Sequence, residues 1–104
     1  MDIQLKRGYV EMCALAAMLN GETYGYKLIK DLSPVIEISE STLYPVLKRL
    51  ENSGCLTVRR QEHNGRLRKY YLATETGKQR IKDFLNDFKE IETTVNFIKE
   101  AYGE

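Results

Sequence analysis

Apolar residues recur every three or four positions in the first third of the chain, which is the period of an amphipathic helix. Two helices are predicted there, separated by Asn20-Gly21, a pair that favours a left-handed helix stop. Thr23 offers an N-cap hydroxyl for the second helix, and Ser33-Pro34 ends it. The apolar positions are Leu5, Tyr9, Met12, Cys13, Ala16 and Leu19 in the first helix and Tyr24, Leu28, Ile29 and Leu32 in the second.

A third amphipathic helix contains a proline. The β-branched run 35–38 predicts one small strand, and Ser39 then caps the helix. Its apolar stripe consists of Leu43, Val46, Leu47 and Leu50. Pro45 faces the opposite side with Ser41 and Lys48, and it deprives only the carbonyl of Ser41 of a partner. The helix is therefore expected to survive, with a slim polar end that can approach another surface closely.

The next segment changes to a period of two, which is typical of strands. Leu56 and Val58 are predicted to be the apolar positions of the first strand. Tyr70 and Leu72 are predicted to be those of the second strand. The Asn-Gly pair at 64–65 predicts a tight hairpin turn, because both residues tolerate positive φ. Near the turn the hairpin carries Arg59, Arg60, Arg66, Arg68 and Lys69.

The last segment begins with Thr74 as a cap and repeats apolar residues at alternating steps of three and four. This heptad seam consists of Ile81, Phe84, Phe88, Ile91, Val95, Ile98 and Tyr102. Three heptads exceed what so small a chain can cover, so the seam predicts a homodimer. Packing of the helix on its own domain is the alternative. The expected division is 1–74 for DNA binding and 75–104 for dimerisation.

Composition limits the remaining choices. A chain of 104 residues with 42% hydrophobic residues forms one compact unit. No apolar run approaches the roughly 20 residues of a membrane span, and MDIQLKRGYV lacks a signal-peptide profile, so a cytoplasmic protein is expected. Cys13 and Cys55 form no CxxC pair and are expected to be small core residues, with a redox switch between subunits as the alternative.

Charge is distributed unevenly although the net charge is only +1. Residues 39–74 hold seven Lys or Arg and three Glu, a net charge of +4 that attracts phosphate. An enzyme is not expected, because the single histidine, His63, lies beside the turn and no GxSxG, HExxH or glycine-rich phosphate loop occurs. We expect a solvated flank of the seam, and not an acid–base pair, at Asp83, Asp87 and Glu90. No cofactor or metal site is expected.

The order of the predicted elements is that of a winged helix-turn-helix, mainly α with a small β-hairpin wing, followed by a dimerisation helix. The segments TYGYKLIKDL, SESTLYPVLKRLENSGCL and RLRKYYLATETG resemble the PadR family of bacterial transcriptional regulators, in its shorter branch with a single C-terminal helix. The resemblance covers most of residues 23–77. It implies a homodimer that binds a palindromic operator in double-stranded DNA, represses transcription and is released by an effector.

The resemblance also implies roles for particular residues. The third helix would enter the major groove, and the wing would contact phosphate or the minor groove. The expected DNA contacts are Tyr24, Ser39, Ser41, Thr42, Tyr44, Lys48, Arg49, Arg66 and Lys69.

Alternatives accompany several of these roles. Packing beneath the wing is the alternative for Tyr44, and pairing with glutamates is the alternative for Arg49 and Arg59. Phe84 and Phe88 are read first as a purely structural stripe, and the alternative that the resemblance implies is a pocket between subunits for a small hydrophobic or aromatic effector. The rival function is a winged-helix adaptor that grips an acidic protein partner instead of DNA.

Overall fold

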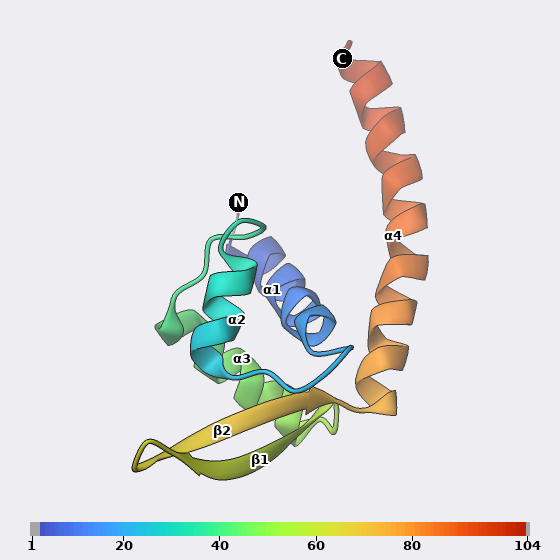
Figure 1. Cartoon of the computed structure of the whole chain (residues 1–104). Coiled ribbons are helices and arrows are strands. Elements are labelled where there is room, and N and C mark those ends of the chain that lie inside the picture. Colours follow the sequence, from blue (N-terminus) through green and yellow to red (C-terminus); the bar gives the residue numbers. More distant parts are fainter. Residues whose placement is uncertain (1–2, 104) are drawn as a thin grey trace.

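Four helices and one β-hairpin make up the computed structural model of the chain, which describes residues 3–103 and the side chains from residue 5 onward (Figure 1). In chain order the elements are α1 (Ile3–Ala17), α2 (Gly25–Leu32), α3 (Glu40–Asn52), β1 (Leu56–His63), β2 (Arg66–Ala73) and α4 (Glu75–Tyr102). The predicted fold class, mainly α with a hairpin wing and a long C-terminal helix, is confirmed.

The core lies where α1, α2 and α3 meet above the base of the hairpin (Figure 1). The predicted stripe of α3 is confirmed, since each of its four residues is at most 3% exposed. The predicted stripe of α1 is partly wrong, because Leu5 and Ala16 are exposed whereas Val10, Ala14 and Leu15 are buried. α1 is apolar around most of its circumference and packs against four elements (α2, α3, α4 and β2), so periodicity alone does not single out its buried face.

The start of α2 is tied to the hairpin. The prediction that Thr23 caps this helix is wrong, because Tyr24 is the N-cap residue. Instead Thr23 forms a single β-bridge with Tyr71, with N–H to O distances of 3.0 and 2.8 Å in the two directions. This pairing spans 48 positions of sequence, and it fixes α2 against the wing.

Two further local predictions are wrong. The run 35–38 forms no strand, because the N–H groups of Val35 and Ile36 both donate to the carbonyl of Leu32, 2.9 Å away, and turn the chain after α2. The left-handed helix stop predicted at Asn20-Gly21 is also wrong, because α1 already ends at Ala17 and neither residue of the pair has a positive φ. The predicted end of α2 at Ser33 is confirmed.

α3 tolerates its proline as predicted. Ser39 is the N-cap, and its carbonyl accepts from the N–H groups of Thr42 and Leu43. Pro45 lies inside the helix on its exposed face. The early position of Pro45 limits the loss to one hydrogen bond.

The hairpin turn is confirmed, with φ of 52° at Asn64 and 78° at Gly65. The predicted inward face of β1 is also confirmed, but that of β2 is wrong. Tyr71 and Ala73 are 6% and 7% exposed, whereas Leu72 is 36% exposed. The register pairs Tyr71 with Val58, so these two residues share the face that packs on the core. β2 carries apolar residues on both faces, which is why alternation did not decide between them.

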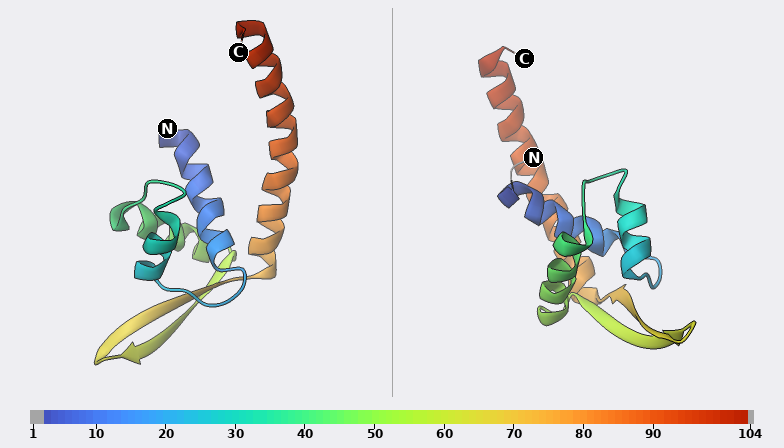
Figure 2. Two further views of the ribbon diagram at one scale, coloured as in Figure 1. Left: turned by 45° about the horizontal axis from the view of Figure 1, so that its top comes forward. Right: turned by 90° about the vertical axis from the view of Figure 1, so that its left-hand side faces the viewer.

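α4 leaves the body of the molecule after its first turns (Figures 1 and 2). Thr74 caps it as predicted, accepting a hydrogen bond from the N–H of Gly77. Ile81 and Phe84 pack against the core, and the ring of Phe84 meets Tyr9 edge to face with centroids 5.6 Å apart. The rest of the seam is exposed along a molecule 59 Å long, and it consists of Phe88, Ile91, Val95, Ile98 and Tyr102.

Candidate nucleic-acid interface

Three hydroxyl side chains lie together at the start of α3. The Oγ of Ser39 makes no capping bond to the helix backbone. It lies 2.9 Å from the Oγ of Ser41 and 3.2 Å from the Oγ1 of Thr42. All three residues are exposed. Small donors and acceptors at an exposed helix end can hydrogen-bond base edges or phosphate oxygens.

Lys48 and Arg49 differ in how firmly the fold engages them. Lys48 has a side chain that is 71% exposed, and its contact with Glu51 at 3.5 Å is a surface pair within one helix. Arg49 is half-buried and donates from Nε to the carboxylate of Glu11, 3.2 Å away. The pairing alternative therefore holds for Arg49, whereas Lys48 stays on the outward face of α3.

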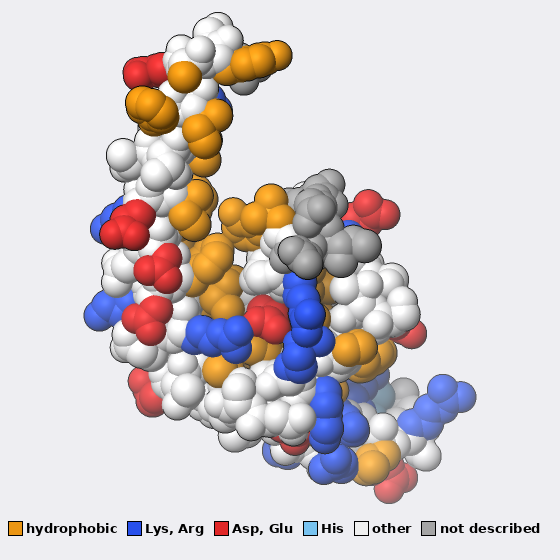
Figure 3. Space-filling model, turned by 180° about the vertical axis from the view of Figure 1, so that it is seen from behind, with side chains coloured by type: hydrophobic (Ala, Val, Ile, Leu, Met, Phe, Trp, Pro, Cys, Tyr) orange, Lys and Arg blue, Asp and Glu red, His pale blue; other side chains and the backbone are white. Residues whose placement is uncertain are grey.

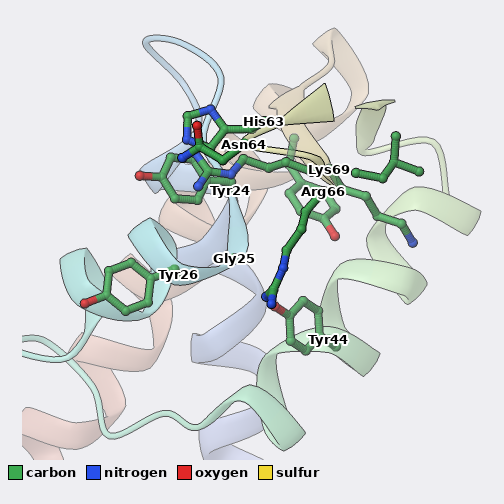
Figure 4. Close-up of a pocket in the computed structure, with 11 residues that line it drawn as sticks. Tyr24, Gly25, Tyr26, Tyr44, His63, Asn64, Arg66 and Lys69 are labelled. Carbon is green, nitrogen blue, oxygen red and sulfur yellow. The ribbon is translucent and has the colours of Figure 1, made fainter. Parts of the chain in front are cut away.

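A groove of about 580 Å³ opens between the start of α2, α3 and the hairpin (Figure 4). It brings together four of the residues expected to contact DNA, namely Tyr24, Tyr44, Arg66 and Lys69. Figure 4 shows Arg66 extending from the hairpin toward Tyr44. A concave surface lined by cationic side chains raises the local concentration of phosphate.

Tyr44 owes its position to a glycine on the neighbouring helix. A Cβ at Gly25 would lie 2.5 Å from the hydroxyl oxygen of Tyr44 and 3.1 Å from its ring. The tyrosine therefore packs against the start of α2 while it remains 46% exposed at the groove. Tyr44 therefore both packs against α2 and lines the groove.

Two arginines and two tyrosines stack in a row beside the groove. The guanidinium of Arg68 lies 4.1 Å from the ring centre of Tyr24, and Tyr24 meets Tyr70 edge to face at 5.9 Å. The guanidinium of Arg59 lies 4.7 Å from the ring centre of Tyr70. Cation–π contacts of this kind orient the side chains. Arg68 was predicted only as part of the positive charge of the hairpin. Tyr26 was not predicted at all, although it lines the groove, is 71% exposed and stands beside Tyr24 in the TYGY motif.

The comparison with known families decides the identity of this fold. The model of the "Transcriptional regulator PadR-like family" matches residues 14–83, which include α2, α3, the hairpin and the start of α4. The chain belongs to the transcriptional regulator PadR-like family. Its members are transcriptional regulators, not enzymes, so this chain is a regulator.

Relatives of known name and structure agree with this PadR-like assignment. The negative transcriptional regulator PadR of Bacillus subtilis is 32% identical over 95 residues, which cover 85% of this chain and 52% of that protein. A PadR family transcriptional regulator from Eggerthella lenta has a structure with a TM-score of 0.85, 30% identity and coverage of 94% of this chain and 88% of the other. The structure of Bacillus subtilis PadR in complex with operator DNA has a TM-score of 0.68 and 27% identity, over 73% of this chain and 46% of that one.

Arg59 has a structural role in this PadR-like chain. Its Nε and one terminal nitrogen donate to the two carboxylate oxygens of Glu22, each over 2.8 Å. This double hydrogen bond lowers the pKa of Glu22 and raises the pKa of Arg59. The predicted alternative for Arg59 is thus confirmed, and the pair ties the loop before α2 to the wing.

The two phenylalanines considered for an effector pocket differ in environment. Phe84 is half-buried against Tyr9 and borders a groove of about 240 Å³ between α1 and α4, which Asp83 and Asp87 also line. Phe88 lies one turn further along the seam and is 38% exposed. This groove of the PadR-like fold therefore combines apolar and charged side chains, including Met12, Phe84 and Arg80 beside the two aspartates.

The two cysteines lie in or against the core. Cys55 is 2% exposed, and burial raises the pKa of the half-buried Cys13 thiol. A raised pKa lowers the thiolate fraction and hence the reactivity of Cys13. Within residues 3–103, no helix is long and apolar enough to cross a membrane, and no three His, Cys, Asp or Glu residues are grouped as metal ligands would be.

Proposed function

We propose that this PadR-like regulator binds double-stranded operator DNA as a homodimer and represses transcription. One observation carries the proposal: α3 presents an exposed hydroxyl cluster at its start, and Tyr44 of the same helix borders a cationic groove formed with the wing. A helix presenting small polar groups fits the major groove, while flanking cations bind phosphate. The relative that is bound to operator DNA supports this mode of DNA binding, and the relative named a negative regulator supports repression rather than activation.

The unpaired length of α4 supports the homodimer. Five seam residues beyond Phe84 stay exposed on one face of a 28-residue helix. A second copy of the same seam would cover them by two-fold symmetry. Two α3 helices spaced about 34 Å apart would then read a palindromic operator with half-sites one duplex turn apart.

An effector is the finer part of the proposal. A planar hydrophobic compound would contact Phe88 and the groove beside Phe84 at the dimer interface. Such a compound releases the operator only if it binds the free dimer more tightly than the DNA-bound dimer. A regulator of bacterial transcription that acts in this way works on the chromosome in the cytoplasm.

The test is a mobility shift with the DNA upstream of the protein's own gene, against a shuffled duplex of equal length and composition. We expect tighter binding to the upstream DNA and a stoichiometry of two chains per site. Equal capture of both duplexes would contradict operator recognition. Absence of capture even at low salt, together with retention of an acidic protein partner, would replace DNA binding by the adaptor function.

A further inference from the structure

A second cationic groove lies on the other side of α3 from the wing. It has a volume of about 350 Å³ and runs between the first turns of α1 and the N-terminal half of α3. Its lining includes the cations Lys6, Arg7 and Arg49. Thr42 and Pro45 of α3 also line it. Lys and Arg side chains accordingly form a column on the face seen in Figure 3.

Two of the three cations of this groove form no ion pair among the residues that the structure describes. Lys6 is half-buried and Arg7 is exposed, and neither forms an ion pair with any residue between 3 and 103. Arg49 contributes its Nε to Glu11, and Glu11 also accepts from Arg80. Within the described residues, Lys6 and Arg7 thus remain available beside the polar start of α3.

The two grooves flank the same helix. Tyr44 borders the wing-side groove, whereas Ser41 and Thr42 border the α1-side groove. The major groove of B-DNA is about 12 Å wide and is bounded by a phosphate backbone on each side. An α-helix with its side chains is about as wide, so a helix in the groove brings one backbone to each of its flanks.

We propose that Lys6 and Arg7 of α1 bind the phosphate backbone opposite to the one that the wing binds. α3 would then lie in the major groove between two cationic clamps, one formed by the hairpin and one by α1. This inference rests on the proposed binding of operator DNA and adds α1 to the interface. Phosphate contacts fix the orientation of the reading helix without carrying sequence information themselves.

The experiment compares two double variants that remove the same charge. Lys6→Gln/Arg7→Gln removes the α1 clamp, and Lys82→Gln/Lys89→Gln removes two exposed cations from α4. Binding to the upstream duplex and to a shuffled duplex is measured across salt concentrations. We expect the α1 variant to lose about 2 from the log–log salt slope per subunit, and at least about tenfold in affinity near 0.1 M salt. The ratio of affinities for the two duplexes stays unchanged, and the α4 variant behaves like the wild type.

A charge-preserving swap guards against a folding defect. Lys6→Arg/Arg7→Lys keeps both charges and is expected to keep the wild-type salt slope. Thermal unfolding checks that each variant is folded. If the wild type captures DNA and the α1 variant keeps the wild-type slope, or if both Gln variants lose slope equally, the clamp is refuted while DNA binding stands. If the wild type captures no duplex at any salt concentration, the proposed function itself fails.

Discussion

The Nε of Arg49 on α3 lies 3.2 Å from the carboxylate of Glu11 on α1 and donates a hydrogen bond to it. The second carboxylate oxygen accepts from Arg80 of α4 at 2.5 Å. Glu11 is 12% exposed and thus links three helices through one side chain. α3 and α4 therefore share a fixed charge on α1, in addition to their apolar contacts with it.

We predict that Glu11→Gln lowers the free energy of unfolding by about 1–2 kcal/mol, because two partly exposed guanidinium groups lose their counter-charge. Chemical denaturation followed by circular dichroism measures the change. Glu90→Gln, an exposed neutralisation on α4, is the control and is expected to stay within about 0.5 kcal/mol of the wild type. Equal midpoints for Glu11→Gln and Glu90→Gln would show that the link contributes nothing.

Two glycine-to-alanine changes are predicted to have opposite signs. A Cβ at Gly77 would lie 2.2 Å from the backbone oxygen of Cys55, which cannot move aside, so Gly77→Ala destabilises the fold by about 2–4 kcal/mol. At Gly8, a helical position with nothing within 4 Å, alanine stabilises by about 0.5–1 kcal/mol. Thermal and denaturant unfolding of the two variants decide the matter. A stable Gly77→Ala protein would mean that α4 does not approach the backbone of Cys55 this closely.

The sequence was most informative where one element decides its own structure. The stripe of α3, the Asn64–Gly65 turn and the Thr74 cap depend on local periodicity or on a single side chain, and all were predicted. Thr23 was misassigned because its backbone pairs with Tyr71, a contact between distant positions that no local pattern encodes. The strand predicted at 35–38 failed because the chain folds back onto the carbonyl of Leu32 instead.

The residues of the candidate site were likewise predicted where local sequence decides their position, and not where a distant contact decides it. Arg66 and Lys69 were correctly placed on the wing, since a tight turn and a cluster of like charges identify an exposed tip. Arg49 could not be resolved from sequence, because its partner Glu11 lies 38 positions away. The row that joins Arg68 to Tyr24 was missed for the same reason: it depends on how α2 meets the hairpin.

The Glu22–Arg59 pair predicts a dependence of stability on pH. The hydrogen bond from Arg59 lowers the pKa of Glu22 below its ordinary value of 4.5, so the pair stabilises the folded state above that pH and loses this effect as the pH falls through the lowered pKa. The difference in stability between wild type and Arg59→Gln should therefore shrink on acidification. The part that remains at low pH is the contribution of Arg59 stacking on Tyr70, which does not depend on pH. Denaturation from neutral to acidic pH measures it, with Arg60→Gln as the control. A difference that stays constant with pH would contradict the pair.

The proposed seam predicts a specific loss of dimerisation. Val95→Asp places an unpaired carboxylate in the centre of the seam, at a cost of about 3 kcal/mol, so the dimer dissociation constant should rise by about a hundredfold. Val95 is 40% exposed in the single chain, so the fold itself should persist. Asn96→Asp adds the same charge one position away, outside the heptad seam, and should leave the dimer intact. Sedimentation at several concentrations distinguishes the two variants; indistinguishable values, or a wild type that is monomeric throughout, would refute the seam.

The two kinds of DNA contact are predicted to fail differently. Lys69→Ala removes the proposed phosphate contact on the wing, so we expect binding to weaken on every duplex and the log–log salt slope to fall by about 1 per subunit. Thr42→Ala removes a hydroxyl that we propose lies beside the base edges, so we expect the preference between operator and single-base variants to change by about 1–3 kcal/mol while the salt slope is unchanged. Titrations of both variants on operator and shuffled duplexes at several salt concentrations separate these effects. If Thr42→Ala weakens all duplexes alike, α3 does not read bases at that position, and if Lys69→Ala changes base preference, the wing does more than hold the backbone.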